Sequence, residues 1–144
     1  MKSILVLNGP NLNLLGNREP EIYGADTLAD IEKLCVKKAV SLNIQVSFFQ
    51  SNIEGELVNE IQKSKNKQDG IILNAGAYTH TSIAIMDALI ATQVPTIEVH
   101  ISNIYHRESF RHVSYISKAT IGQICGFGIY GYSMALDAII QNNL

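Results

Sequence analysis

The sequence has few cysteines, little excess charge and no long hydrophobic run. Its 144 residues contain two cysteines, and 11 Lys and Arg against 13 Asp and Glu give a net charge of -2. This near balance excludes the basic surface that binding to nucleic acid or to an anionic membrane requires. The first apolar run is too short for a signal peptide, and no segment is long enough to span a bilayer. We therefore expect a cytoplasmic protein without nucleic-acid or membrane partners.

The cysteine and histidine residues show no pattern that is typical of a metal site. Cys35 and Cys125 lie inside apolar segments, so we expect buried thiols in a reducing compartment. A single disulfide between them is the less favoured alternative. Neither C-x-x-C nor H-E-x-x-H occurs in the chain, so we expect no metal site.

Two kinds of apolar segment alternate along the chain. Short runs rich in β-branched and aromatic residues predict strands, and longer segments with apolar residues three or four positions apart predict helices. No linker, repeat or low-complexity segment interrupts them, so we expect one domain that covers residues 1–144. The predicted strands hold residues 5–7, 44–49, 70–73, 95–101 and 119–125. The predicted helices hold residues 28–42, 57–61, 83–90, 110–113 and 134–140. Asp26 or Thr27 would cap the first helix, and Ser51 or Asn52 would open the second.

The wholly apolar central strands predict a parallel sheet that helices cover on both faces. With five strands the simplest arrangement is a flavodoxin-like three-layer α/β sandwich with strand order 2-1-3-4-5. Its ligand crevice lies at the carboxyl ends of strands 1 and 3, where the winding reverses. Polar residues follow the strands at this edge: Asn8, Asn11, Arg18 and Tyr23 after the first, residues 74–80 after the third, and residues 100–111 after the fourth.

The segment after the first strand, as far as Gly24, is longer than an ordinary strand-to-helix turn. Leu12, Leu14 and Leu15 are apolar residues that can anchor it to the body of the protein. Arg18 and Tyr23 stand at its far end. A long anchored loop after a central strand predicts an active-site lid, and a solvated surface loop is the alternative.

Glu98 and His100 are two residues apart on a predicted strand, so their side chains share one face, opposite Ile97 and Val99. A carboxylate that fixes the tautomer of an imidazole makes it a good proton donor. A structural ion pair is the alternative. Tyr23 is a plausible general base because Arg18, on the same loop, favours the tyrosinate form.

Several further residues indicate a site for an anionic ligand. Arg107 and Arg111 are four residues apart, so on one helical face they could clamp a carboxylate or hydroxyls, although solvated surface is an equal alternative. Backbone N–H groups of residues 101–103 follow a strand and can cradle an anion. His80 and Asp87 flank the start of the third helix, where Asp87 is a lone carboxylate in an apolar segment and needs a partner.

Gly126, Gly128 and Gly131 form a G-x-G-x-x-G motif between a predicted strand and the last helix. A dinucleotide-binding motif belongs instead to the first strand–helix–strand unit and is followed by a further strand. Close packing of the helix on the sheet is therefore the favoured interpretation, and a nucleotide site is the alternative.

Taken alone, the residues predict a cofactor-free enzyme that uses Tyr and His for proton transfer on a small, anionic, hydroxylated substrate. A nucleotide- or flavin-binding module and a structural interaction domain are the competing hypotheses. The sequence also closely resembles the type II 3-dehydroquinate dehydratases of the shikimate pathway, over nearly its whole length. Four blocks carry this resemblance: LNGPNLNLLGNREPEIYG, NAGAYTHTSIAIMDAL, EVHISNIYHRESFRH and GFGIYGY.

The resemblance implies dehydration of 3-dehydroquinate to 3-dehydroshikimate through an enolate, without a cofactor. It also implies a dodecamer built from four trimers. Tyr23 would be the base, kept ionised by Arg18, and His100, oriented by Glu98, would be the acid. By the same resemblance, Asn11 would hold a water, and Asn74, Ile101 and Ser102 would bind the substrate carboxylate. Arg111 and His80 would hold the ring hydroxyls. Asp87 would reach the site from a neighbouring subunit.

Overall fold

The computed structural model describes residues 1–17 and 19–143, apart from the side chain of residue 143. Its five parallel strands lie in the order β2-β1-β3-β4-β5. The predicted flavodoxin-like α/β sandwich is confirmed. The strands are β1 (Ser3–Asn8), β2 (Gln45–Gln50), β3 (Gly70–Asn74), β4 (Thr96–His100) and β5 (Gly122–Cys125).

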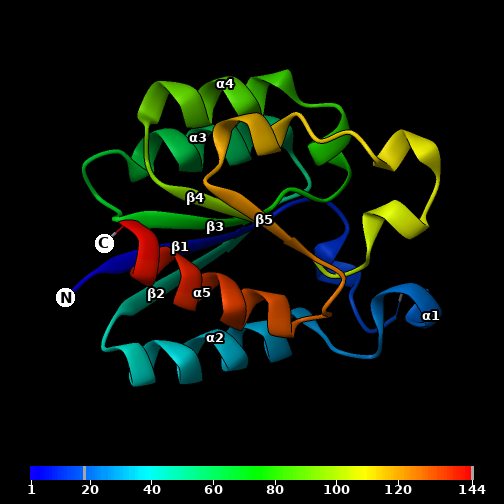
Figure 1. Cartoon of the computed structure of the whole chain (residues 1–144), viewed down its shortest axis with the longest axis horizontal. Helices are drawn as coiled ribbons and strands as arrows, with labels where there is room; N and C mark the ends of the chain where they lie inside the picture. Colours follow the sequence, from blue (N-terminus) through cyan, green and yellow to red (C-terminus); the bar gives the residue numbers. More distant parts are fainter. Residues whose placement is uncertain (18, 144) are drawn as a thin grey trace.

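Helices cover both faces of the sheet, with α2 and α5 on one face and α3 and α4 on the other (Figure 1). The loops that follow the strands gather at one edge of the sheet, and the N-terminus and the end of α5 lie at the opposite edge. Within the described part of the chain, no helix has the length and hydropathy to cross a membrane. The helices are α1 (Pro20–Tyr23), α2 (Leu28–Leu42), α3 (Glu54–Ser64), α4 (Ile83–Thr92) and α5 (Tyr130–Asn143).

The hydrophobic core has two layers because alternate residues of the buried strands face opposite sides of the sheet. Val6 and Ile72 pack in the layer against α2 and α5. Leu7 and Leu73 pack in the layer against α3 and α4. All four are inaccessible to solvent, so β1 and β3 form the centre of the sheet and hold its carboxyl edge in place.

Local signals set the beginnings of two helices. Of the two predicted caps for α2, Thr27 is the one used: its hydroxyl accepts from the Asp30 N–H at 3.2 Å, and the Asp30 carboxylate accepts from the Thr27 N–H. Helix α3 begins later than predicted, with Ile53 at its N-cap. Ser51 still contributes, because its hydroxyl accepts from the Ile53 N–H at 2.9 Å.

The bounds of β4, β5 and α5 differ from the predicted ones. Strand β4 is one residue shorter at each end, and β5 begins at Gly122 because Ile116–Ala119 forms a 3-10 turn, η5, against α4. Helix α5 begins at Tyr130, four residues before the prediction. Cys125 is half-buried rather than buried, because it ends an edge strand. Cys35 is buried, as predicted, and both thiols are free.

The predicted short helix around Phe110 and Val113 is wrong. The segment instead forms two 3-10 turns, η3 (Ile104–His106) and η4 (Ser109–Arg111). Phe110 and Val113 are 65% and 56% exposed. These side chains bury too little apolar surface to stabilise a helix against the core.

The segment after β1 holds a 3-10 turn, η1 (Leu12–Leu14), and the short helix α1. Leu12 and Leu15 are buried in the core layer under α2 and act as the predicted anchors. Leu14 is 47% exposed and does not, because it points outward from the turn. Tyr23, the last residue of α1, is thereby held over the carboxyl edge of the sheet.

The glycine motif before α5 allows close packing of helix on sheet, as predicted. A Cβ atom on Gly131 would lie 3.3 Å from a methyl carbon of Val99 and 3.5 Å from one of Ile124. Val99 is fully buried and, being β-branched, has little rotamer freedom. A side chain at this position would therefore push α5 away from the sheet.

We expect two glycine-to-alanine substitutions to change stability in opposite directions. Gly131→Ala should lower the free energy of unfolding by about 1–3 kcal/mol through overpacking. Gly55→Ala, in α3, meets no atom within 4 Å and should raise it by about 0.5 kcal/mol by reducing the freedom of the unfolded chain. Urea unfolding at one fixed protein concentration measures both. Equal destabilisation by the two variants would contradict this account of Gly131.

Candidate active site

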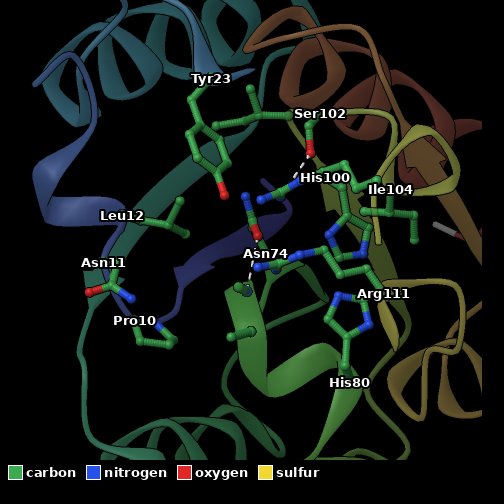
Figure 2. Close-up of a pocket in the computed structure, with 14 residues that line it drawn as sticks. Pro10, Asn11, Leu12, Tyr23, Asn74, His80, His100, Ser102, Ile104 and Arg111 are labelled. Carbon is green, nitrogen blue, oxygen red and sulfur yellow. Dashed lines mark hydrogen bonds between the residues drawn. The ribbon is translucent and has the colours of Figure 1, made fainter. Parts of the chain in front are cut away.

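A cavity opens at the carboxyl edge of the sheet, next to the ends of β1 and β3. Figure 2 shows the residues that line it. The cavity lies at the switch point at which the sequence predicts the ligand crevice. Eight of the predicted site residues line it. They are Asn11 and Tyr23 after β1, Asn74 and His80 at and after β3, and His100, Ile101, Ser102 and Arg111 at and after β4.

Glu98 lies behind His100 on the same face of β4 and is inaccessible to solvent. Its carboxylate accepts hydrogen bonds from His100 Nε2, from the hydroxyls of Ser114 (2.9 Å) and Ser117 (2.7 Å), and from Gln123 Nε2 (2.9 Å). Burial by itself raises the pKa of Glu98. The hydrogen bonds and the charge of His100 outweigh burial and hold that pKa below its usual range, so Glu98 is an anion.

An ionised carboxylate only accepts hydrogen bonds, so His100 must donate its Nε2–H to Glu98. The other ring nitrogen, Nδ1, is then the atom that can carry an exchangeable proton toward the cavity. This arrangement suits a general acid.

His80 stacks on His100, with the ring centroids 6.3 Å apart and the planes 18° from parallel. Its Nδ1–H donates to the Val113 carbonyl at 2.7 Å. Burial lowers the pKa of His80, and the positive charges of His100 and Arg111 add to this, against the opposite effect of the Val113 hydrogen bond. His80 is therefore neutral near pH 7, and its Nε2 is an acceptor for a hydroxyl group.

Asn74 forms the floor of the cavity and is almost fully buried. Its amide oxygen accepts from the Gly76 N–H at 3.1 Å, and its amide nitrogen donates to the Tyr132 hydroxyl at 2.9 Å. Tyr132 in turn donates to Asn8 Oδ1 at 2.6 Å. The Asn74 amide is thus held at both ends.

Two arginines make the cavity cationic. The Cζ atom of Arg107 lies 5.2 Å from the centroid of the Tyr23 ring, and its Nη1 donates to the Ser102 hydroxyl at 3.4 Å. Arg111 Nε donates to Glu108 at 3.2 Å, which leaves its terminal nitrogens for the cavity. Arg107 and Arg111 lie on separate turns rather than on one helical face, yet both line the cavity. The hydroxyl end of Tyr23 points toward the same space (Figure 2).

Two of the predicted site residues that the structure describes do not line this cavity. Glu98 acts from behind His100. Asp87 is exposed on α4 and lies outside the cavity of its own chain. The prediction for Arg18 falls outside the described residues.

Four residues that hold the site were not predicted from the sequence: Ser114, Ser117, Gln123 and Tyr132. Gln123 faces Glu98 directly in the β4–β5 register, so strand pairing was the signal that could have identified it. Tyr132 follows the glycine motif immediately. For the two serines no local pattern exists, because their partner lies 16 and 19 residues away.

Comparison with known proteins assigns the family. The family model "Dehydroquinase class II" matches residues 2–140. The chain belongs to the class II dehydroquinases. This class II dehydroquinase is therefore a hydro-lyase, and the family predicted from the sequence is confirmed. The chain is 61% identical over 141 residues to a 3-dehydroquinate dehydratase of Endomicrobium trichonymphae, with 98% of this chain and 99% of the relative covered.

Two further matches agree. The 3-dehydroquinate dehydratase of Dinoroseobacter shibae is 58% identical over 136 residues, covering 94% of this chain and 91% of the relative. The crystal structure of a type II dehydroquinase from Butyrivibrio crossotus superposes with a TM-score of 0.94 at 46% identity, covering 96% of this dehydroquinase and 97% of the other chain. The matches span nearly the full length of each relative.

We expect Glu98→Gln to be destabilising in a pH-dependent way. At neutral pH the loss should be about 3 kcal/mol, because the neutral amide cannot accept from all the donors around it. The folded-state pKa of Glu98 is lowered, so its stabilising effect is present above the unfolded value of about 4.3 and is lost as pH falls through the folded value.

The measurement is the urea midpoint of both proteins between pH 7 and pH 3, at one protein concentration. The gap between the original protein and Glu98→Gln should narrow as the pH falls below about 4.3. Ser109→Ala, in an exposed turn, is the control. A gap that stays constant over this range would show that folding does not lower the pKa of Glu98, and a gap that widens as the pH falls would show that folding raises it.

Proposed function

We propose that this protein dehydrates 3-dehydroquinate to 3-dehydroshikimate, with Tyr23 as base and His100 as acid. The observation that carries the proposal is the pairing of the two groups in one cationic cavity: Tyr23 beside Arg107, and His100 backed by the buried anion Glu98. Such separate environments favour opposite proton-transfer roles in the two side chains.

The first step is removal of a proton from C2 of the substrate, which the neighbouring ketone makes acidic. The phenolate of Tyr23 takes the proton, the electron pair of the C–H bond forms a double bond between C2 and the ketone carbon, and the π electrons of the ketone move to its oxygen to give an enolate. The Arg107 guanidinium on the ring face stabilises negative charge nearby. In this proposal Arg18 keeps Tyr23 ionised, as expected from the sequence, and Asn11 holds a water at the enolate oxygen.

The second step is loss of the C1 hydroxyl. The enolate re-forms the ketone, its electrons form the C1–C2 double bond, and the C–O bond breaks. His100 donates a proton to the departing oxygen, so that water leaves and not hydroxide. Glu98 stabilises the protonated imidazole before this step and holds the ring in place during it.

The rest of the cavity binds the substrate. We assign its carboxylate to the Asn74 amide and to the backbone N–H groups of Ile101 and Ser102, at the end of β4. Ring hydroxyls are assigned to Arg111 and to His80, whose neutral ring offers an acceptor. The cationic cavity suits an anionic substrate.

The proposal includes an assembly of four trimers in which a neighbouring subunit contributes Asp87. Helix α4 supports this, because Ile83 and Ile90 are each 53% exposed on either side of Asp87. An exposed apolar helix face with one carboxylate fits a symmetric contact between copies, in which each site borrows the same group. A cytoplasmic location is also proposed, and the free thiols of Cys35 and Cys125 support it.

Tyr23→Phe should reduce turnover about a thousandfold, because a general base contributes roughly 10²–10⁴-fold. Ligand binding should change little. The measurement is exchange of the C2 proton in deuterated water, alongside formation of the conjugated enone. Tyr105→Phe, an exposed tyrosine outside the cavity, is the control. Near-normal exchange by Tyr23→Phe would assign the base to another group.

Mixing two inactive variants tests the shared site. Asp87→Ala and Tyr23→Phe chains, exchanged in equal amounts, should regain about one quarter of the original activity, because a complete site needs Tyr23 from one chain and Asp87 from another. Labelled subunits establish that exchange has occurred. If exchanged oligomers gain nothing over the separate variants, Asp87 does not act across the interface.

A further inference from the structure

The G-x-G-x-x-G motif between β5 and α5 has no part in the proposed reaction, yet it contacts the site. Gly126, Gly128 and Gly131 are followed at once by Tyr132. We call residues 126–132 the glycine–tyrosine segment. Its inferred role rests on the proposed binding of the substrate carboxylate by Asn74, Ile101 and Ser102.

Two backbone hydrogen bonds join the glycine–tyrosine segment to the end of β4. The Gly126 N–H donates to the His100 carbonyl at 3.2 Å, and the Gly128 N–H donates to the Ile101 carbonyl at 3.0 Å. A peptide group is planar, with its C=O and N–H on opposite sides. Fixing those two carbonyls therefore turns the N–H groups of Ile101 and Ser102 away from the segment. These are the N–H groups assigned to the carboxylate.

The first of these contacts requires glycine. Gly126 has a φ of 96°, in the region that side chains disfavour. A Cβ atom there would also lie 3.2 Å from Cβ of Asn103, the residue next to Ser102. The backbone can thus approach the end of β4 closely enough to hold it.

The last residue of the segment fixes the third donor. Tyr132 is fully buried, and its hydroxyl connects Asn8 at the end of β1 with Asn74 at the end of β3. Burial raises the pKa of Tyr132 far above neutrality, so the hydroxyl keeps its proton and donates it to Asn8. The oxygen of that hydroxyl then accepts from one N–H of the Asn74 amide, and the second N–H of the amide is available to the cavity.

We propose that the glycine–tyrosine segment is a positioning unit for the substrate carboxylate, with Tyr132 as its principal positioning residue. It aligns three N–H donors, two from the backbone after β4 and one from Asn74, on a single anionic group. The motif thus serves an anion site without contacting the anion. Its contacts are with the carbonyl groups of His100 and Ile101 and, through the buried Tyr132 hydroxyl, with Asn74.

The test compares Tyr132→Phe with Tyr130→Phe, which removes a hydroxyl from an exposed position of the same helix. The probes are quinate and its methyl ester, as competitive inhibitors with and without the carboxylate. In Tyr132→Phe the KM for 3-dehydroquinate should rise about tenfold while kcat changes less than threefold, since one charge-assisted hydrogen bond is misaligned. The preference for quinate over its ester should fall about tenfold, and Tyr130→Phe should leave all three values unchanged.

If a folded Tyr132→Phe protein prefers quinate over its methyl ester as strongly as the original protein does, the inference is overturned. Should that variant fail to fold, Asn8→Ala keeps the tyrosine but removes the acceptor of its hydroxyl, and the same loss of preference is expected. Asn74→Ala separates the inference from the proposed function. If Asn74→Ala also keeps the preference for quinate, the assigned carboxylate site is wrong; if only Tyr132→Phe keeps it, the site stands and the positioning role fails.

Discussion

A buried anion is the constraint on which the candidate site depends. The Glu98 carboxylate has no access to water, and an ion in that position costs several kcal/mol unless donors surround it. Those donors come from three places: His100 on β4, Gln123 on β5, and Ser114 and Ser117 on the segment between them. Satisfying one charge therefore ties the edge of the sheet to the loop that carries Arg111.

The same cavity gives its two proposed proton-transfer groups different neighbours. His100 is hydrogen-bonded to the anion Glu98, while the Tyr23 ring lies against the guanidinium of Arg107. In water both interactions would be weak. Partial burial strengthens them, because the effective dielectric constant falls away from bulk solvent. A fold that places His100 at the end of β4 and Tyr23 at the end of α1 keeps their environments distinct.

The position of a motif in the fold decides what it does. The G-x-G-x-x-G pattern follows the last strand, where Gly131 allows α5 to pack closely on Val99 and Gly126 donates to the carbonyl of His100. The competing hypothesis of a nucleotide-binding module rested on the motif and on the crevice alone. Family membership assigns the chain to the class II dehydroquinases, and the contacts of the glycines give the motif a packing role.

The order of the strands, the shared face of Glu98 and His100, and the collection of polar residues at one sheet edge were all predictable from the sequence, because they follow from local periodicity and from the rules of parallel sheets. The partners of Glu98 and the role of Tyr132 were not. Tyr132 bonds to Asn8 across 124 residues, and such a contact leaves no periodic signal in either segment. The short turns around Phe110 were missed for a related reason: Phe110 and Val113 stay exposed and do not pack as a helix on the core, and only the tertiary structure decides this.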